Sequence, residues 1–99
     1  MAENTREVAQ IGKSVVIKGE LSGSEDLYLD GEVEGSIELK QNAVTIGPNG
    51  KAKAKITAKS VVVDGKVNGN VIGSDRVELR GSSVVIGDIV TKRIVTVDV

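Results

Sequence analysis

The residues that could do chemistry in this sequence are first of all the carboxylates Asp26, Asp30, Glu32 and Glu34. Neighbouring carboxylates can act as general acid and base, or they can bind a calcium ion. These residues occupy even-numbered positions in a stretch whose odd-numbered positions are apolar or small, so they share one face of a strand. Because lysines are predicted beside them, we interpret them as a solvent-exposed surface.

The lysines at positions 51, 53, 55 and 59 form a basic strip that could contact anionic lipid or nucleic acid. The whole chain, however, has 13 basic and 14 acidic residues and a formal charge of −1. Binding of duplex nucleic acid requires a net basic face, so a salt-paired surface is the better interpretation. The segment 47–51, GPNGK, lacks the spacing and the Ser or Thr of a phosphate-binding loop.

The 99 residues contain no His and no Cys, and Tyr28 is the only aromatic residue. This composition excludes imidazole bases, thiol nucleophiles, disulfides and nearly every zinc site, and it offers no aromatic platform for sugars. An acyltransferase on a left-handed β-helix is the alternative, but such enzymes generally use a histidine and repeat strictly in sixes. We therefore expect no catalytic residue, no cofactor, no metal site and no enzymatic activity. The chain also lacks an apolar run of membrane-spanning length and a signal peptide, so a cytoplasmic protein is expected.

The chain is organised by a repeat. Pairs of β-forming residues separated by one position recur along it: Val15/Ile17, Leu27/Leu29, Val44/Ile46, Val61/Val63, Val77/Leu79 and Ile94/Thr96. The first members of these pairs are 12, 17, 17, 16 and 17 residues apart. Alternation with a period of two predicts strands. The dipeptides Asp30-Gly31, Asn49-Gly50 and Asp64-Gly65 recur at one place in the repeat, which favours parallel stacking over an antiparallel sandwich of hairpins.

These patterns predict an all-β, single-domain parallel β-helix (solenoid) of about six windings over residues 14–99. Residues 1–13 are polar and aperiodic, and they predict a flexible N-terminal tail. A core of Val, Ile, Leu and Ala without aromatic residues suits a narrow stack of identical layers. At a strand spacing of ~4.8 Å, six windings would form a rod roughly 25–30 Å long.

Aligning the repeats predicts which residues are neighbours between windings. The charged neighbours are Glu32 with Lys51, Glu34 with Lys53, Lys18 with Asp30, Asp64 with Arg80 and, as a like-charged pair, Glu20 with Glu32. Small residues fall in two columns. Gly35, Ala54, Gly69 and Gly87 would fill a crowded inward column, and Gly19, Gly31, Gly50 and Gly65 a corner where positive φ is expected.

Each end of such a rod exposes an unpaired strand edge and a slice of core. The C-terminal segment 94–99, IVTVDV, is strongly β-forming, and no proline or lysine cluster blocks it. We therefore predict that molecules associate end to end. The predicted contact residues are Val15, Ile17 and Leu21 at one end and Ile94, Val95 and Val97 at the other.

Four stretches carry a resemblance to a known family: IGKSVVIKGEL (11–21), EDLYLDGEVEGSIEL (25–39), ITAKSVVVDGKVNGNV (56–71) and VVIGDI (84–89). The sequence resembles the bactofilins, a family of bacterial cytoskeletal proteins. The resemblance implies a right-handed, triangular parallel β-helix that polymerises through both ends into nonpolar filaments without nucleotide. It further implies a scaffolding role in cell shape or protein localisation. The implied partners are other copies of the chain, the inner membrane through the N-terminal tail, and cell-wall enzymes, but not nucleic acid.

Overall fold

The computed structural model describes residues 8–97, and these residues form strands and turns only. The strands are β1 (Val8–Ile11), β2 (Val16–Ser22), β3 (Asp26–Leu29), β4 (Glu32–Ile46), β5 (Lys51–Val63), β6 (Lys66–Asn68), β7 (Val71–Arg80), β8 (Val84–Ile86), β9 (Ile89–Thr91) and β10 (Ile94–Val97). Every pairing between them is parallel. The predicted all-β parallel β-helix is confirmed.

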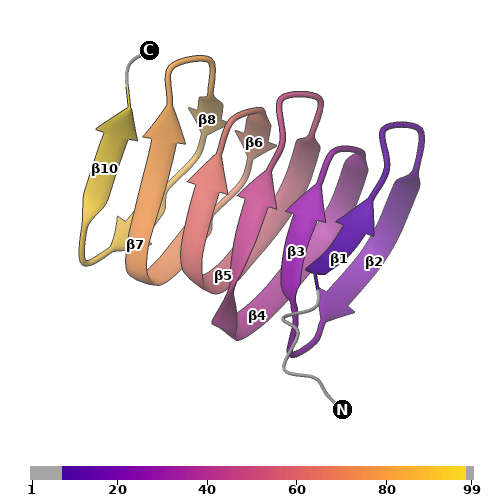
Figure 1. Ribbon diagram of the computed structural model, residues 1–99, viewed down its shortest axis with the longest axis horizontal. Coiled ribbons are helices and arrows are strands. Elements are labelled where there is room, and N and C mark those ends of the chain that lie inside the picture. The colour runs from indigo at the N-terminus through magenta and orange to yellow at the C-terminus, as the bar shows by residue number, and fades with distance from the viewer. Residues whose placement is uncertain (1–7, 98–99) are drawn as a thin grey trace.

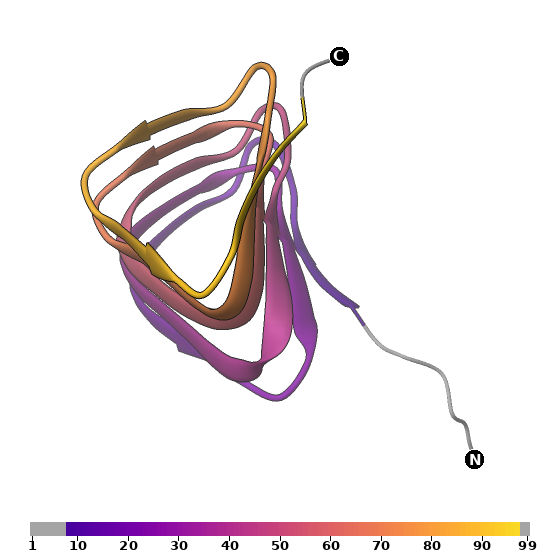
Figure 2. The same ribbon diagram turned by 90° about the vertical axis from the view of Figure 1, so that its left-hand side faces the viewer.

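The windings enclose a triangular cross-section, which is seen end-on in Figure 2. Side A consists of residues 8–11, 26–29, 44–46, 61–63, 77–80 and 94–97. Side B consists of residues 16–18, 32–34, 51–53, 66–68 and 84–86. Side C consists of residues 21–22, 37–39, 56–58, 71–73 and 89–91. Side A faces the viewer in Figure 1.

The solenoid is right-handed. In Figure 2 the C-terminal end is nearest the viewer, and the chain passes anticlockwise from β8 through β9 to β10 as it approaches. Figure 1 agrees, because the front strands run upward while the chain advances from right to left. The handedness that the resemblance implied is therefore the one observed.

The register shows how long each winding is. Ile11 is in register with Leu29, and the same column continues winding by winding through Ile46, Val63, Leu79 and Thr96. The described chain therefore passes side A six times and completes five turns. The successive windings are 18, 17, 17, 16 and 17 residues long by this register. The uniform length follows from the repeat in the sequence.

The first winding differs from the predicted one. The sequence alignment placed Val15/Ile17 beside Leu27/Leu29, but the structure pairs Ile17 with Val33 and Ile11 with Leu29. Alternation with a period of two occurs on all three sides, so it does not indicate which side an apolar pair occupies. Strand β1 consequently lies inside the segment 1–13 that was predicted as a tail, so residues 8–11 belong to the first winding. The rest of that predicted tail, residues 1–7, lies outside the described residues.

The core is a set of aliphatic columns that run along the rod axis. Leu29, Ile46 and Val63 on side A are fully buried, and Val33 and Ile37 extend the same layer to sides B and C. The described residues include no buried polar or charged side chain. Each winding therefore contributes one thin apolar layer, and most of the stabilisation comes from burying Val, Ile and Leu against the adjacent layers.

Glycines with positive φ occur at the corner between sides B and C. They are Gly19, Gly35, Gly69 and Gly87, with φ between 135° and 147°. Gly19 lies beside Gly35 and belongs to this column, not to the Gly31 column in which the sequence placed it. Gly31, Gly50 and Gly65 do not have positive φ, so that part of the prediction is wrong. Gly19, Gly31 and Gly35 are each followed two positions later by an inward aliphatic residue, so sequence spacing alone does not separate the two corners.

The predicted charge neighbours are confirmed in the middle of the rod and wrong at its start. Glu32 is in register with Lys51, and Glu34 with Lys53. Lys18 lies beside Glu34 instead of Asp30, and Glu20 lies beside Ser36 instead of Glu32. Both errors follow from the misaligned first winding.

The predicted pair of Asp64 and Arg80 takes other partners in the structure. The Ser82 hydroxyl donates to Asp64 Oδ1 at 3.1 Å, and Arg80 Nε donates to Glu78 Oε2 at 3.1 Å. The remaining ion pairs between described residues are Lys40–Glu38, Arg76–Glu78 and Arg93–Asp75, at 3.4 to 4.0 Å. The Lys40–Glu38 and Arg93–Asp75 pairs are exposed and contribute little to stability, whereas the Glu78 side chain is only 12% accessible between its two arginines.

Asp26 hydrogen-bonds the corner between sides C and A, where residues 40–43 of β4 turn. The register of β4 with β5 shifts between Leu39 and Ala43, and Asp26 Oδ1 accepts hydrogen bonds there from Ala43 N at 3.0 Å and Asn42 Nδ2 at 3.3 Å. We expect Asp26→Ala to lower the free energy of unfolding by about 1–2 kcal/mol, because hydrogen bonds to a charged group are lost. Urea denaturation measures this.

Glu38→Ala is the matched control for that experiment, because Glu38 is exposed and its pair with Lys40 at 3.4 Å is on the surface. This control should change the free energy of unfolding by less than about 0.5 kcal/mol. Equal urea midpoints for the two variants would show that Asp26 does not fix the corner.

Candidate assembly interface

The rod has unpaired strand edges at both ends. In the described chain, β1 pairs only with β3 and β2 only with β4 at the N-terminal end. At the C-terminal end, β8 pairs only with β6, while β9 and β10 pair only with β7. These edges are seen at the right and left of Figure 1. A row of free backbone N–H and C=O groups is a template for pairing with another strand.

Apolar side chains are exposed at the same two ends. The large hydrophobic residues that the structure exposes are Val15, Val16, Val84, Ile86, Val90 and Ile94, between 43% and 61% accessible. All of them belong to the first or the last winding. Ile94 is exposed because no described winding covers the column of Val77 that it continues. Val84, Ile86 and Val90 are exposed because they point away from the core.

The N-terminal end is hollow. A depression of about 420 Å³ opens there, and the apolar side chains of Ala9, Ile11, Ile17, Leu21, Leu27 and Leu39 line it. Ile17 and Leu21 are half-buried and pack on the core from one side only. The structure thus brings together these two predicted contact residues.

Val15, the third residue predicted at this end, lies at the neighbouring corner and is 43% exposed. Its N–H donates to Gly12 O at 3.0 Å, and its carbonyl accepts from Glu32 N at 2.9 Å. Its backbone is therefore used inside the rod, and only its side chain is free for contacts.

The C-terminal end is the last layer of the stack. Ile94 continues the column of the buried Val77, yet it is 56% exposed because no further winding covers it. Val95 follows Glu78 on the outer face of side A and is half-buried. Val97 pairs with Arg80 through its backbone, and its side chain lies outside the described residues.

Sequence reasoning missed Val85 and Ile89 at this end. Val85 follows the buried Val67, and Ile89 follows the buried Val71, so both are core residues with one side uncovered. Continuing the Val67 and Val71 columns by one repeat would have identified them.

Comparison with known proteins shows the family of the chain. Residues 9–98 match the family described as "Bactofilin: Polymer-forming cytoskeletal". The chain belongs to the bactofilin family. The suspected resemblance is confirmed, and the chain is thus a member of a polymer-forming cytoskeletal family with a β-solenoid fold.

Curated bactofilins of Myxococcus xanthus (strain DK1622) are its relatives. The chain is 44% identical to bactofilin BacO and 38% identical to bactofilin BacP, each over 88 residues or 89% of its length. Those alignments cover 69% of BacO and 36% of BacP. Bactofilin BacN is 49% identical over 57 residues, which is 58% of this chain and 50% of BacN. No solved structure matched the chain.

The carboxylates that could have formed a site are dispersed in this bactofilin. Asp26 binds the corner at Ala43, and Asp30 Oδ1 accepts from Asn49 N at 3.2 Å at another corner. Glu32 and Glu34 lie on side B. Within residues 8–97, no three acidic side chains gather where they could hold a metal ion.

The basic strip is also divided. Lys51 and Lys53 lie on side B, whereas Lys55 and Lys59 follow the corner at Ala54. Over the described part of the bactofilin, no helix is long and apolar enough to cross a bilayer. The carboxylates and lysines singled out in the sequence therefore do not form one common site.

Proposed function

We propose that this bactofilin assembles end to end into nonpolar filaments without nucleotide, and that the filaments act as a scaffold for cell shape or protein localisation. The observation that carries the proposal is the coincidence of unpaired strand edges and exposed apolar side chains at both ends of the rod. Stacking a second copy on an end would add another layer to each column and would pair the free edge.

The proposed contacts are made by Val15, Ile17 and Leu21 at the N-terminal end and by Ile94, Val95 and Val97 at the C-terminal end. Ile17, Leu21 and Ile94 have the strongest support, because each continues a core column and lacks a covering layer. Their burial in a junction would remove from water the apolar surface that the monomer exposes.

Like-to-like junctions are supported by the outer surface of the last winding. If two copies join their C-terminal ends about a two-fold axis, residues of the last winding of one copy lie against residues of the last winding of the other. The outward residues of the last winding on sides B and C are Val84, Ile86 and Val90. In earlier windings the same columns carry charged residues, among them Lys66 and Glu38. Apolar cross-strand pairs avoid the repulsion that like charges would cause.

Assembly without nucleotide is supported by the turn at Gly47–Lys51. The N–H groups of Gly47, Gly50 and Lys51 donate to Leu29 O, Gly47 O and Gly31 O at 2.7 to 2.8 Å. The Asn49 N–H donates to Asp30 at 3.2 Å. These amides are used within the fold, so they do not form the free cradle that a phosphate requires.

The scaffold role rests on the polymer and not on a reaction. A filament would present the same three sides repeatedly, so each copy could hold one partner. We propose that the chain is a structural, non-enzymatic protein of the cytoplasm. The partners proposed from the resemblance are the inner membrane, through the N-terminal tail, and cell-wall enzymes. Within residues 8–97 no contact favours the acyltransferase alternative.

Negative-stain electron microscopy of the purified chain in nucleotide-free buffer tests the proposal. We expect thin filaments whose number rises with protein concentration, and added ATP or GTP should not change them. Class averages of the filaments should show no consistent direction along the filament axis. Monomers at every concentration and ionic strength tried would refute the proposal.

A further inference from the structure

The open edge of β2 turns the corner between sides B and C without interruption. Strand β2 is in register with β4 over its whole length, and Gly19 lies at the corner in its centre. Lys18 and Glu20 flank this glycine, and both side chains are exposed. One position further out on either side is a half-buried aliphatic residue, Ile17 or Leu21. The edge is therefore symmetric in shape about Gly19 and opposite in charge.

The backbone carbonyls of Lys18 and Glu20 face the open end of the rod. In the last winding, Ile86 O and Asp88 O occupy the same columns and accept hydrogen bonds from N–H groups of the preceding winding at 2.8 to 2.9 Å. No described winding precedes β2, so the equivalent carbonyls of Lys18 and Glu20 point along the rod axis without such a donor. An antiparallel strand could pair with this edge.

The outward column that begins at Lys18 alternates in sign. Lys18 is in register with Glu34, and Glu34 is in register with Lys53. Glu20 lies beside Ser36 in the neighbouring column. Within residues 8–97, neither Lys18 nor Glu20 forms an ion pair within 4.0 Å. An acidic residue on the open side of Lys18 would continue the alternation.

We propose that two copies join their N-terminal ends about a two-fold axis through Gly19, so that β2 pairs antiparallel with β2 of the second copy. This register sets Lys18 against Glu20 twice and Ile17 against Leu21 twice, because each copy supplies both members of each pair. Lys18 and Glu20 are then the residues that determine which end of a second rod is accepted. The inference rests on the proposed function, since it specifies how the ends of two rods meet.

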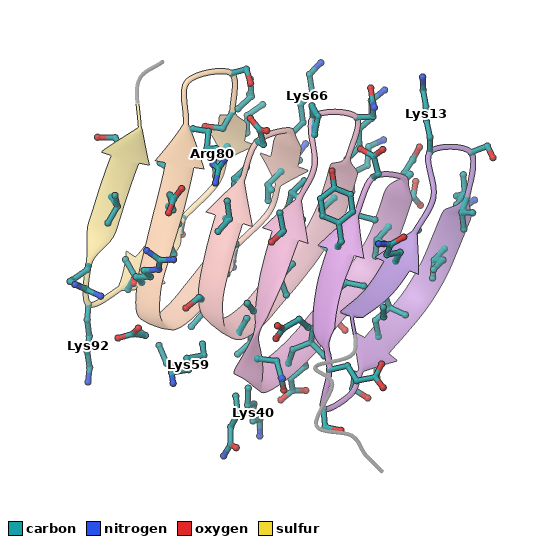
Figure 3. All side chains as sticks on the ribbon, in the orientation of Figure 1. Lys13, Lys40, Lys59, Lys66, Arg80 and Lys92 are labelled. Atoms are coloured by element: carbon teal, nitrogen blue, oxygen red, sulfur yellow. The ribbon has the colours of Figure 1, made fainter. Side chains whose placement is uncertain are left out.

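The same axis would fill the hollow at the N-terminal end. An axis through the corner at Gly19 also crosses the middle of side A, so it exchanges the other two corners, which Lys13 and Lys40 mark at opposite edges of side A in Figure 3. Val15 then lies opposite Gly23, which lines the hollow and contributes no side chain to it.

The direction of the Val15 side chain supports this contact. Val15 occupies the column of Gly31, because the carbonyls of both residues accept from the first strand residue of side B in the next winding. A Cβ at Gly31 would meet Val15 O and Gly12 O, both in the preceding winding. Side chains in this column therefore project toward the N-terminal end, and Val15 projects out of that end toward the second copy.

The same two charges disfavour the stacking of unlike ends. If the last winding of one copy lay on the first winding of another in the register of the solenoid, Asp88 would lie beside Glu20 and Ile86 beside Lys18. Two carboxylates would then repel each other, and the ammonium group would face an aliphatic side chain. The N-terminal end is thus complementary to another N-terminal end.

Charge reversal tests the inference in a full chain that carries Ile94→Asp, whose C-terminal end cannot join. We expect this parent to be a dimer in sedimentation velocity. Adding Lys18→Glu should set carboxylates against carboxylates, and adding Glu20→Lys should set ammonium groups against each other, so each should weaken dimerisation by about tenfold or more. An equimolar mixture of the two variants should recover the dimer, because each introduced charge then meets its opposite in the other chain.

Lys53→Glu in the same parent is the matched control. It makes the same change in the same outward column and, like Lys18→Glu, places the new carboxylate beside Glu34. Because Lys53 lies two windings from the edge, roughly 10 Å away, its reversal should change dimerisation by less than about twofold. Equal losses for Lys18→Glu and Lys53→Glu would overturn the inference, as would an equimolar mixture of the two end variants that stays monomeric.

Disulfide cross-linking locates the axis, because the chain contains no cysteine of its own. In the Ile94→Asp parent with Val15→Cys and Gly23→Cys, oxidation should link position 15 of one copy to position 23 of the other, as peptide mapping would show. Opposed residues of antiparallel strands lie about 4.5–5.5 Å apart at Cα, a separation that a disulfide spans. Links from 15 to 15 or from 23 to 23 would place the axis at another corner and would overturn the inference.

The outcomes also separate this inference from the proposed function. Dimers of the Ile94→Asp parent that neither charge reversal weakens would refute the Gly19 register and leave the joining of like ends intact. Stronger filament formation by Glu20→Lys alone would show that unlike ends join, because the new ammonium group would meet Asp88, and both the inference and the nonpolar filament would be wrong. An unsubstituted chain that stays monomeric would refute the two together.

Discussion

A chain that carries both Leu21→Asp and Ile94→Asp is expected to stay monomeric, whereas either substitution alone should leave dimers. Leu21 lies in the hollow at the N-terminal end, and Ile94 is the uncovered residue of the last layer. A carboxylate buried without a partner in a junction costs roughly 2–5 kcal/mol, which weakens association by about 30-fold to several thousand-fold. If like ends join, each single variant retains one intact kind of junction.

Sedimentation velocity on the three variants measures the result. Joining of unlike ends gives a different outcome, because every junction would then use both residues and either single variant would already be monomeric. The control is Ser22→Asp, which adds the same charge to the exposed outer face of β2, next to Leu21. It should still form filaments, and its failure to do so would show that charge on the edge strand, not the open core, controls assembly.

Gly35→Ala is expected to lower the free energy of unfolding by about 2–6 kcal/mol. Gly35 has a φ of 135°, a conformation that costs an L-residue about 1–3 kcal/mol. A Cβ at this position would also overlap the carbonyl oxygen of Gly19 in the winding below. Backbone atoms cannot move aside as a flexible side chain can, so overpacking adds about 1–3 kcal/mol.

Gly19→Ala separates the two causes. Gly19 has nearly the same φ, 136°, but nothing lies within 4 Å of a Cβ placed there, because it belongs to the first winding. This variant should therefore lose only about 1–3 kcal/mol from backbone strain. Guanidinium denaturation of both variants measures the difference, and equal losses would mean that the contact between windings is not the main cost.

The middle of the rod could be predicted from the sequence, and its first winding could not. The columns of Leu29, Ile46 and Val63 follow from the 17-residue interval, and the register of Glu32 with Lys51 follows from the columns. Near the start, Ile17 sits on side B, but its alternating neighbours look the same as those of side A. A period of two identifies a strand without indicating which of three sides it forms.

The candidate interface was likewise predicted only in part from the sequence. Ile17, Leu21 and Ile94 could be predicted because each ends a column of aliphatic residues. Val85 continues the Val67 column, so alternation with a period of two already places Val84 and Ile86 outward. The predicted contact residues left this strand out because the prediction followed the segment 94–99 and not the other two sides of the last winding.

The direction of the backbone hydrogen bonds has a mechanical consequence. Every parallel pairing in this rod links one winding to the next, so its hydrogen bonds run along the rod axis. Tension along the axis would therefore strain the bonds of all three sides of a winding together, whereas bending would open one side first. A filament built from such rods should resist stretching more strongly than bending, and it should break at a junction between copies, where no peptide chain crosses the gap.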